Sequence, residues 1–377
     1  MGELKYVPAL STSFMDIKGH IEVGDKKFST QWWRDDCFFK YNALLVSAFY
    51  GMKVGFNFRE LLDIKKDTLL IVDSGGYQVI RQNAWIEPIE LIKWQEKNAD
   101  ICLILDNPPY YMDITKVEDR IISEQESFDR GLERTLRFTE IMERNKTSDT
   151  LKVYNVLHGV TVKDMKFWYE KMSRFKFNGW ALSMHPPAPM RAGVISSLIY
   201  TLEQPESVHF LLGSGFNTMP VVVYASKRLF KSTTLDSLSY HAHGFRQQYV
   251  LPWGLGHDVY DYGWKKDNEK IQLPCPCPVC KEMTIEQMTA SPLGGRPLSL
   301  HNLWLSIQYT EFLKALCQNE ERYKNYINNN YPEEVSKAIA FIDMTLEDGF
   351  EKAYYHFLKD IEESVPEQKK TLKGVLG

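Results

Sequence analysis

Thr68-Leu-Leu-Ile-Val-Asp-Ser-Gly-Gly-Tyr-Gln78 is the stretch of this 377-residue chain that decides its fold. Its first part, Thr68–Val72, is a short continuous apolar run that stops at Asp73 and two glycines. A run of this kind, closed by turn residues, predicts a parallel strand that is buried on both faces. The polar residues after the strand are then the informative ones for function.

The same pattern recurs along the chain. Further apolar runs stop at a polar or turn residue, namely Ile101–Leu105 before Asp106, Leu151–Leu157 before His158, Trp180–Leu182 before Ser183 and Val208–Leu212 before Gly213. Helical patterns lie between these runs, at Pro88–Ala99, Val117–Arg144, Thr161–Phe175 and Ala192–Leu202. This alternation predicts βα units, which suit a doubly wound sheet or a barrel. The number of units favours an α/β protein with a (β/α)8 TIM barrel, formed by residues 1–377 as one domain.

The residues that end the strands predict the location of the chemistry. In a barrel, the carboxyl ends of all strands face one mouth. Six such residues would meet there, namely Asp73, Asp106, His158, Ser183, Gly213 and Asp236. A single Asp after a strand is as well explained by a helix N-cap. Three carboxylates together favour function, because one can attack an anomeric carbon, one can transfer protons and one can read a purine edge.

A cysteine cluster predicts a metal site. Cys275, Cys277 and Cys280 lie within six residues, and His301 follows twenty-one residues after Cys280. Three thiolates and an imidazole are ligands that zinc prefers, and four protein ligands leave no open position for catalysis. We therefore expect a structural Zn2+ in a zinc-binding subdomain at about residues 270–305, and the alternative is buried or disulfide-bonded cysteines.

Composition sets further bounds. The net charge is −4, so a nucleic-acid partner needs a local basic patch; the candidates are residues 240–270 and Lys227-Arg228. The polar-aromatic segment Trp32–Asp36 predicts an ordinary packed loop or, less well, the lining of a groove. Neither a signal peptide nor an apolar run of membrane-spanning length is found, which predicts a cytoplasmic protein, in the host cytoplasm if it is phage-encoded. Residues 319–377 predict a C-terminal helical tail.

These motifs, in this order, resemble the tRNA-guanine transglycosylase superfamily over about Leu69 to Trp304. The resemblance implies base exchange on a ribose, with Asp236 as nucleophile and Asp73 as general acid/base. It implies that Asp106 recognises the base and that the ring of Tyr77 stacks on it. It further implies substrate binding by Ser74, Gly76, His158, Ser183 and Gly213, and zinc ligation by Cys275, Cys277, Cys280 and His301.

Departures from the family pattern bear on the substrate. The family usually has Gln-Gly where this chain has His158-Gly159, and the Pro-Thr-Arg motif of the bacterial tRNA enzymes is absent after Asp236. The core looks archaeal, but 76 residues follow His301, fewer than the archaeal RNA-binding module needs. This combination resembles the DNA-guanine transglycosylases of bacterial and phage 7-deazaguanine DNA modification. We therefore expect DNA as partner, with tRNA as the alternative, and a free 7-deazaguanine such as preQ0 as the incoming base.

Two other functions and two modes of assembly stay open at this point. A non-catalytic zinc-stabilised nucleic-acid-binding subunit would be expected to lose catalytic aspartates, whereas this chain keeps three. A hydrolase acting on small nucleosides needs neither a zinc site nor a basic stretch. A homodimer or an accessory ATPase partner is compatible with the sequence, which does not decide between them.

Overall fold

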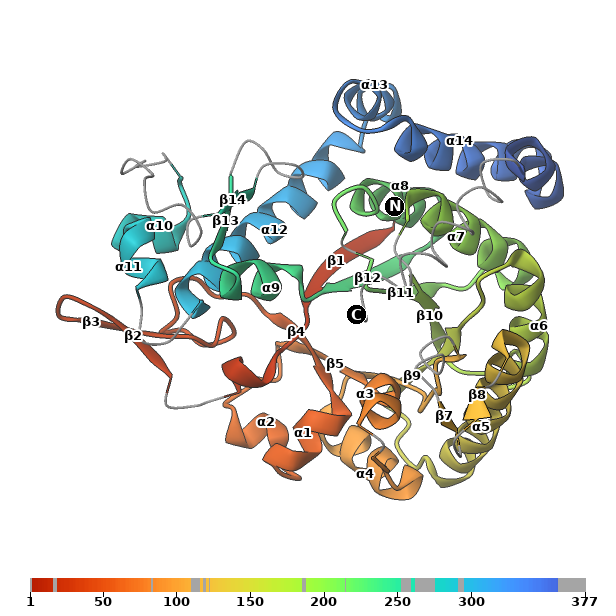
Figure 1. Ribbon diagram of the computed structural model, residues 1–377, viewed down its shortest axis with the longest axis horizontal. Coiled ribbons are helices and arrows are strands. Elements are labelled where there is room, and N and C mark those ends of the chain that lie inside the picture. The colour runs from red at the N-terminus through yellow and green to blue at the C-terminus, as the bar shows by residue number, and fades with distance from the viewer. Residues whose placement is uncertain are drawn as a thin grey trace.

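The chain folds into an eight-stranded parallel sheet rolled into a ring, which the computed structural model shows face-on in Figure 1. The strands of the ring are β1 (Glu3–Pro8), β4 (Ala43–Ser47), β5 (Leu69–Asp73), β6 (Ile101–Leu103), β9 (Lys152–Leu157), β10 (Gly179–Ser183), β11 (Ser207–Leu211) and β12 (Ser232–Ser237). They follow one another around the ring in chain order. The structure describes residues 2–15, 19–82, 84–109, 116–117, 120–121, 123–184, 188–213, 215–251, 259–261, 275–290 and 295–358.

The ring is nearly closed between β1 and β4. Ala9, directly after β1, forms an isolated parallel bridge with Leu45 in β4, and the N–H of Leu10 donates to the carbonyl of Leu45 at 2.7 Å. On its other side, β1 pairs in parallel with β12 along its whole length. The predicted (β/α)8 barrel is therefore confirmed, although β1 itself carried no clear signal in the sequence.

Helices surround the ring, as a barrel requires. They are α1 (Ala48–Val54), α2 (Phe58–Leu61), α3 (Gly76–Arg81), α4 (Pro88–Asn98), α5 (Glu124–Asn145), α6 (Val162–Met172), α7 (Pro189–Glu203) and α8 (Met219–Leu229). After β12, the chain continues through α9 (Ser239–Phe245), α10 (Pro278–Glu282), α11 (Ile285–Thr289) and α12 (Arg296–Leu316). Because α12 packs against α8 and β1, it takes the position of the eighth barrel helix.

Within the described residues, three small antiparallel two-stranded sheets lie outside the barrel sheet. They are β2 (His20–Val23) with β3 (Lys26–Ser29), β7 (Lys116–Val117) with β8 (Arg120–Ile121), and β13 (Gln248–Val250) with β14 (Val259–Asp261). The second hairpin corrects the helix expected over Val117–Arg144, which begins only at Glu124. Ser123 caps this helix by accepting a hydrogen bond from the N–H of Glu126, so a capping side chain fixes the start.

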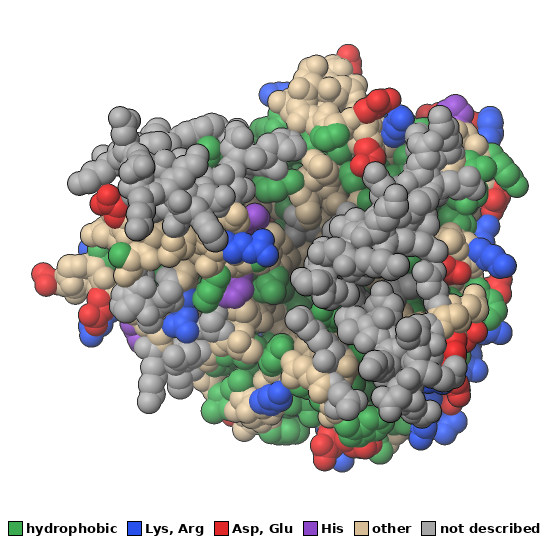
Figure 2. Space-filling model, viewed as in Figure 1, with side chains coloured by type: hydrophobic (Ala, Val, Ile, Leu, Met, Phe, Trp, Pro, Cys, Tyr) green, Lys and Arg blue, Asp and Glu red, His purple; other side chains and the backbone are tan. Residues whose placement is uncertain are grey.

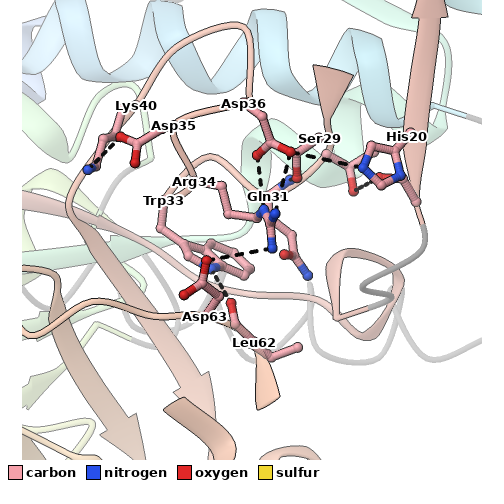
Figure 3. Close-up of polar contacts among 12 residues, drawn as sticks. His20, Ser29, Gln31, Trp33, Arg34, Asp35, Asp36, Lys40, Leu62 and Asp63 are labelled. Atoms are coloured by element: carbon pink, nitrogen blue, oxygen red, sulfur yellow. Dashed lines mark hydrogen bonds and ion pairs between the residues drawn. The ribbon is translucent and has the colours of Figure 1, made fainter. Parts of the chain in front are cut away.

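The segment Trp32–Asp36 is a packed loop between β3 and β4, as the favoured prediction had it. Trp32 and Trp33 are fully buried, and the indole N–H of Trp33 donates to the carbonyl of Leu62 at 2.9 Å. In Figure 3, Arg34 lies between Asp36 and Asp63, and its Nε donates to Asp36 at 2.9 Å. Buried indoles whose N–H groups are satisfied stabilise the loop and do not line a groove.

The described part of the tail is helical. Helices α13 (Glu320–Asn330) and α14 (Glu333–Asp348) follow α12, and α14 packs against α7 and α8 on the outside of the barrel (Figure 1). The predicted helical tail extends to residue 377, and its last part, 359–377, lies outside the described residues. Among the helices that the structure describes, none is long and apolar enough to span a membrane.

Candidate functional site

The three aspartates expected at the barrel mouth lie at the carboxyl ends of three strands. Asp73 is the last residue of β5, Asp236 is the fifth residue of β12, and Asp106 follows β6 after two buried residues. Asp106 and Asp236 are buried, and Asp73 keeps partial exposure. Three acidic groups at one end of a barrel form an anionic site, in which each negative charge raises the free-energy cost of ionising a neighbouring carboxyl group.

The pKa of Asp73 reports this crowding. Burial, followed by the negative charges of Asp106 and Asp236, raises the pKa of Asp73 from its usual value to about 7. The N–H of Gly75 donates to Asp73 at 3.3 Å and partly opposes this rise. Gly75 has φ +84°, a left-handed conformation that glycine adopts without strain. A carboxyl group with a pKa near neutrality can both give and accept a proton.

Asp106 is held by two side chains. The hydroxyl of Ser74 donates to its Oδ1 atom at 2.8 Å, and the Nε2 atom of His158 lies 2.7 Å from its Oδ2 atom. The imidazole of His158 also meets the ring of Trp168 edge to face, with 4.9 Å between ring centroids. A Cβ atom on Gly76 would clash with the carbonyl oxygen of Asp106, so this close approach requires glycine.

Asp236 is anchored through one oxygen. The backbone N–H of Leu212 donates to Oδ1 of Asp236 at 2.7 Å, and Nε2 of His209 lies 3.4 Å from the same oxygen. Leu212 has φ +60°, which is unusual for a residue other than glycine. In this backbone conformation, the N–H of Leu212 points at Asp236. Both of these contacts are to Oδ1 of Asp236, so neither occupies Oδ2, which is left for a substrate.

The remaining residues predicted to bind substrate lie around the same mouth. Ser183 ends β10, Gly213 follows β11, and Tyr77 lies half-buried in the first turn of α3. The carbonyl of Ser183 accepts from the guanidinium of Arg191 at 2.8 Å, and that of Gly159, beside His158, accepts from it at the same distance. Arg191 therefore joins the ends of β9 and β10 beneath the mouth.

Two of these residues were missed by sequence reasoning. His209 is a histidine in the middle of an otherwise apolar strand, and this position was the available signal. Arg191 stands in the first turn of a helix, where a buried arginine is unusual, because a guanidinium is buried only when its donors are satisfied. No local pattern indicated what either side chain contacts, since the partners come from other strands and loops.

The structure does not favour the expectation that Lys227 and Arg228 contact phosphate at the mouth. They lie at the end of α8, close before the start of β12, so they are at the opposite end of the barrel from Asp236. Lys227 donates to the carbonyl of Cys317, and Arg228 forms an ion pair with Glu320. Both cations therefore tie α8 to the C-terminal helices. Lys265, Lys266 and Lys270 lie outside the described residues.

A basic area does lie beside the mouth. Figure 2 shows Lys, Arg and His side chains near the central hollow, on the side of α9 and α12. Arg246 directly follows α9, and Arg296 begins α12. Burial, followed by the charge of Arg296, lowers the pKa of His241 to about 4, so its ring is neutral at pH 7. The two arginines therefore supply the positive charge in this area.

Cys275, Cys277, Cys280 and His301 come together as one cluster that could hold a metal ion. Their ligand atoms all lie within 4.8 Å of one another. The Nδ1 atom of His301 is 3.8, 3.2 and 3.3 Å from the three sulfur atoms, in chain order. These separations fit a tetrahedral ion with metal–sulfur bonds of about 2.3 Å. All six cysteines of the chain are free of disulfides, which removes the disulfide alternative.

The surroundings of the cluster orient its histidine. The Nε2 atom of His301 lies 2.9 Å from the carbonyl of Val250, an arrangement that leaves Nδ1 for a metal. The ring of Tyr249 stacks on His301 with 3.9 Å between centroids. Asn302 accepts from the N–H of Val250 at 3.0 Å and donates to the carbonyl of Gln248 at 3.0 Å. The cluster thus fastens β13 to α12, close to the end of α9.

Comparison with known proteins supports the resemblance seen in the motifs. No protein-family model matches the chain. The chain is 25% identical over 271 residues to the tRNA-guanine(15) transglycosylase of Pyrococcus abyssi, which covers 68% of this chain and 41% of that protein. It is 27% identical over 268 residues to the protein of the same name from Methanococcus aeolicus, covering 67% and 38%.

A third relative gives the same picture. The tRNA-guanine(15) transglycosylase of Pyrococcus furiosus is 22% identical over 314 residues, covering 78% of this chain and 46% of that protein. The chain therefore spans less than half the length of these curated relatives. The similarities support the tRNA-guanine transglycosylase superfamily. All three relatives are named for tRNA, and none of the three is named for DNA.

Proposed function

We propose that this chain, like the transglycosylases it resembles, exchanges guanine in a nucleic acid for another purine-like base through a covalent glycosyl-enzyme. The observation that carries the proposal is the arrangement of three aspartates at the barrel mouth, with Asp236 anchored through one oxygen and Asp73 having a pKa of about 7. A retaining glycosyl transfer needs such a pair, because one carboxylate attacks carbon and the other transfers the proton.

In the first step, Oδ2 of Asp236 attacks C1′ of the ribose and the bond from C1′ to the guanine nitrogen breaks. The departing guanine takes a proton from Asp73, which becomes a carboxylate. In the second step, Asp73 removes a proton from the incoming base, whose nitrogen attacks C1′ and displaces Asp236. Both carboxyl groups return to their starting protonation states, so the cycle needs neither water nor a redox cofactor.

Recognition of the base falls to Asp106 and its neighbours. Asp106 presents acceptor oxygens to purine N–H groups, while Ser74 and His158 hold its plane. Gly76 lets the backbone approach a flat base, and Tyr77 supplies a ring for stacking. Ser183 and Gly213 line the neighbouring strand ends. A zinc ion bound by Cys275, Cys277, Cys280 and His301 would supply folding energy and take no part in the chemistry.

The names of the relatives make tRNA the first polymer to test. DNA stays in the proposal as the second candidate, because the Pro-Thr-Arg motif of the bacterial tRNA enzymes is absent after Asp236. In either polymer a paired guanine must leave its stack to reach a barrel mouth, at a cost of a few kcal/mol. Arg246 and Arg296 beside the mouth are placed to offset part of that cost through phosphate contacts.

The proposal is tested by supplying unmodified tRNA, duplex DNA and single-stranded DNA, each with radiolabelled guanine or with free preQ0. Nucleoside analysis by mass then shows which polymer has gained the free base. Incorporation into tRNA alone identifies the tRNA activity, and incorporation into DNA alone identifies the DNA activity. If no polymer gains label while all of them bind, the chain is a binding subunit; release of guanine without incorporation identifies a hydrolase.

A further inference from the structure

His209 is a fully buried histidine whose role goes beyond core packing. It lies in the middle of β11, between the apolar residues Val208 and Phe210, and has no solvent exposure. Its Nδ1 atom lies 2.8 Å from the hydroxyl of Thr234, and its Nε2 atom lies 3.4 Å from Oδ1 of Asp236. No hydrogen bond within the described residues satisfies that Nε2 atom. A buried polar atom left in this state requires an explanation.

The neighbours of the ring determine which nitrogen carries the proton. A lone pair on Nε2 would face the carboxylate oxygen of Asp236 in a buried site, where the two would repel each other. With the proton on Nε2, the ring can donate to Asp236, while Nδ1 accepts from the hydroxyl of Thr234. The hydroxyl of Thr234 then donates to His209, and His209 donates to the carboxylate of the nucleophile, Asp236.

We infer that His209 is a positioning residue for Asp236, an inference that rests on the proposed transglycosylase function. Together with the N–H of Leu212, which already binds Oδ1 at 2.7 Å, the imidazole holds that oxygen and turns Oδ2 toward the ribose. The separation of 3.4 Å is long for a hydrogen bond. Such contacts are often long in free enzymes and shorten when the substrate is bound.

The position of His209 has a consequence for one half of the reaction. A donor on Oδ1 stabilises the charged carboxylate more than the neutral glycosyl ester that forms when Oδ2 bonds to C1′. In the second step the incoming base takes C1′, the ester bond breaks, and its electron pair returns to Asp236. The His209 donor therefore speeds breakdown of the covalent intermediate, and a loss of the donor should make that intermediate persist.

Two substitutions separate this role from packing. His209→Asn keeps an amide near Thr234, but its side chain is too short to reach Asp236. His209→Gln places an amide N–H near the position of the original Nε2 atom. Thr234→Val removes the hydroxyl that selects the tautomer and leaves the histidine in place. All three should fold, and thermal unfolding of each variant verifies this.

The experiment forms the covalent adduct with the guanine-containing polymer that proves active, adds free base, and follows the decay of the adduct. We expect decay in His209→Asn to be slower by roughly ten- to hundredfold, as for the loss of a hydrogen bond to a charged group. His209→Gln should recover most of the rate, Thr234→Val should be intermediate, and polymer affinity should not change. Equal decay rates in wild type and His209→Asn, or equal defects in the Asn and Gln variants, would overturn the inference.

A second readout does not depend on activity. Nitrogen-15 NMR of the histidine-labelled protein should show His209 with its proton on Nε2, and a Thr234→Val variant should show a mixture of tautomers. A proton on Nδ1 in the wild type contradicts the inference even if exchange occurs. A wild-type protein that forms no adduct with any polymer refutes the proposed function, and the positioning role with it.

Discussion

The Nε2 atom of His158 lies 2.7 Å from Oδ2 of Asp106, and both side chains are almost completely buried. Because Ser74 donates to the other oxygen of Asp106 at 2.8 Å, the protein fixes the plane of this carboxylate before any base arrives. Each oxygen still has a lone pair for a purine N–H. Under the proposed function, base recognition would depend on this preorganised acceptor pair, and disturbing the pair should affect base affinity first.

Asp106→Asn should weaken binding of free guanine or preQ0 by roughly ten- to hundredfold. The substitution replaces one acceptor oxygen by an NH2 group, which faces the donors of the base, and a mispaired buried polar group costs about 1–3 kcal/mol. Calorimetric titration of the base measures this effect. Asp35→Asn is the matched control, because Asp35 forms an exposed ion pair with Lys40 away from the mouth. Base affinity that is unchanged in Asp106→Asn would remove this residue from recognition.

Asp73→Asn should stabilise the fold at alkaline pH. The pKa of Asp73 is raised to about 7 in the fold, so between its unfolded pKa and about 7 the folded state holds a proton that the unfolded state has lost. Stability falls with rising pH across that range, and the penalty is fully present above it. The gain in unfolding free energy from Asp73→Asn should therefore be larger at pH 8 than at pH 5, by no more than about 3 kcal/mol.

Denaturant unfolding of wild type and variant at the two pH values provides the comparison. The partial exposure of Asp73 reduces the difference through solvent screening. Exchange activity should be lost in the same variant, because asparagine cannot transfer the proton. A stability gain that is the same at both pH values would mean that the carboxyl group is not titrating in this range.

Cys275→Ser should lower bound metal and thermal stability together. We expect about one zinc per chain in the wild type by elemental analysis, since the four ligand atoms match a closed tetrahedral site. Loss of a thiolate weakens binding of the ion, and the binding energy of the ion is folding energy. Cys102→Ser, at a buried cysteine outside the cluster, is the control that should retain the metal. If wild-type protein without bound metal were as stable as wild-type protein loaded with zinc, this result would contradict a structural zinc.

Arg228→Gln should change stability but not the affinity for nucleic acid. Arg228 pairs with Glu320 and lies 3.9 Å from Asp343, at the end of the barrel opposite the mouth. We expect a loss of about 1 kcal/mol or less, as for a partly exposed ion pair. Arg246→Gln is the comparison variant, because Arg246 lies beside the mouth. This substitution should lower both the affinity for nucleic acid and the salt dependence of that affinity. The reverse ranking in a binding titration at two salt concentrations would place the polymer on the other end of the barrel.

Local sequence patterns predicted the strands and the metal cluster, because the residues that mark each of them lie close together in the sequence. Runs such as Thr68–Val72 end in turn residues, and the cysteines of the metal cluster lie five residues apart at most. The first strand, Glu3–Pro8, lacked such a signal because the charged residues Glu3 and Lys5 interrupt its apolar residues. The hairpin before α5 was likewise hidden within a segment that looked uniformly helical.

The candidate site follows the same rule. Asp73, Asp106 and Asp236 stand in short motifs at strand ends, so their convergence could be predicted. The contacts of His209 and Arg191 could not, since each partner comes from a different element. Lys227 and Arg228 were expected near the mouth because they are basic, but a charge count does not show which end of a barrel helix faces the mouth. Side-chain pairing across the fold decides these points, and the sequence pattern does not record it.

In the proposed reaction, Asp236 forms a covalent bond to C1′ of the sugar. The most direct test of this step is intact-mass measurement of the denatured protein after incubation with guanine-containing tRNA or DNA and no incoming base, in wild type and in Asp236→Asn. We expect a wild-type species heavier by the mass of the polymer after loss of guanine, and none in the variant. An adduct of equal yield in Asp236→Asn, or guanine exchange by that variant, would contradict this step.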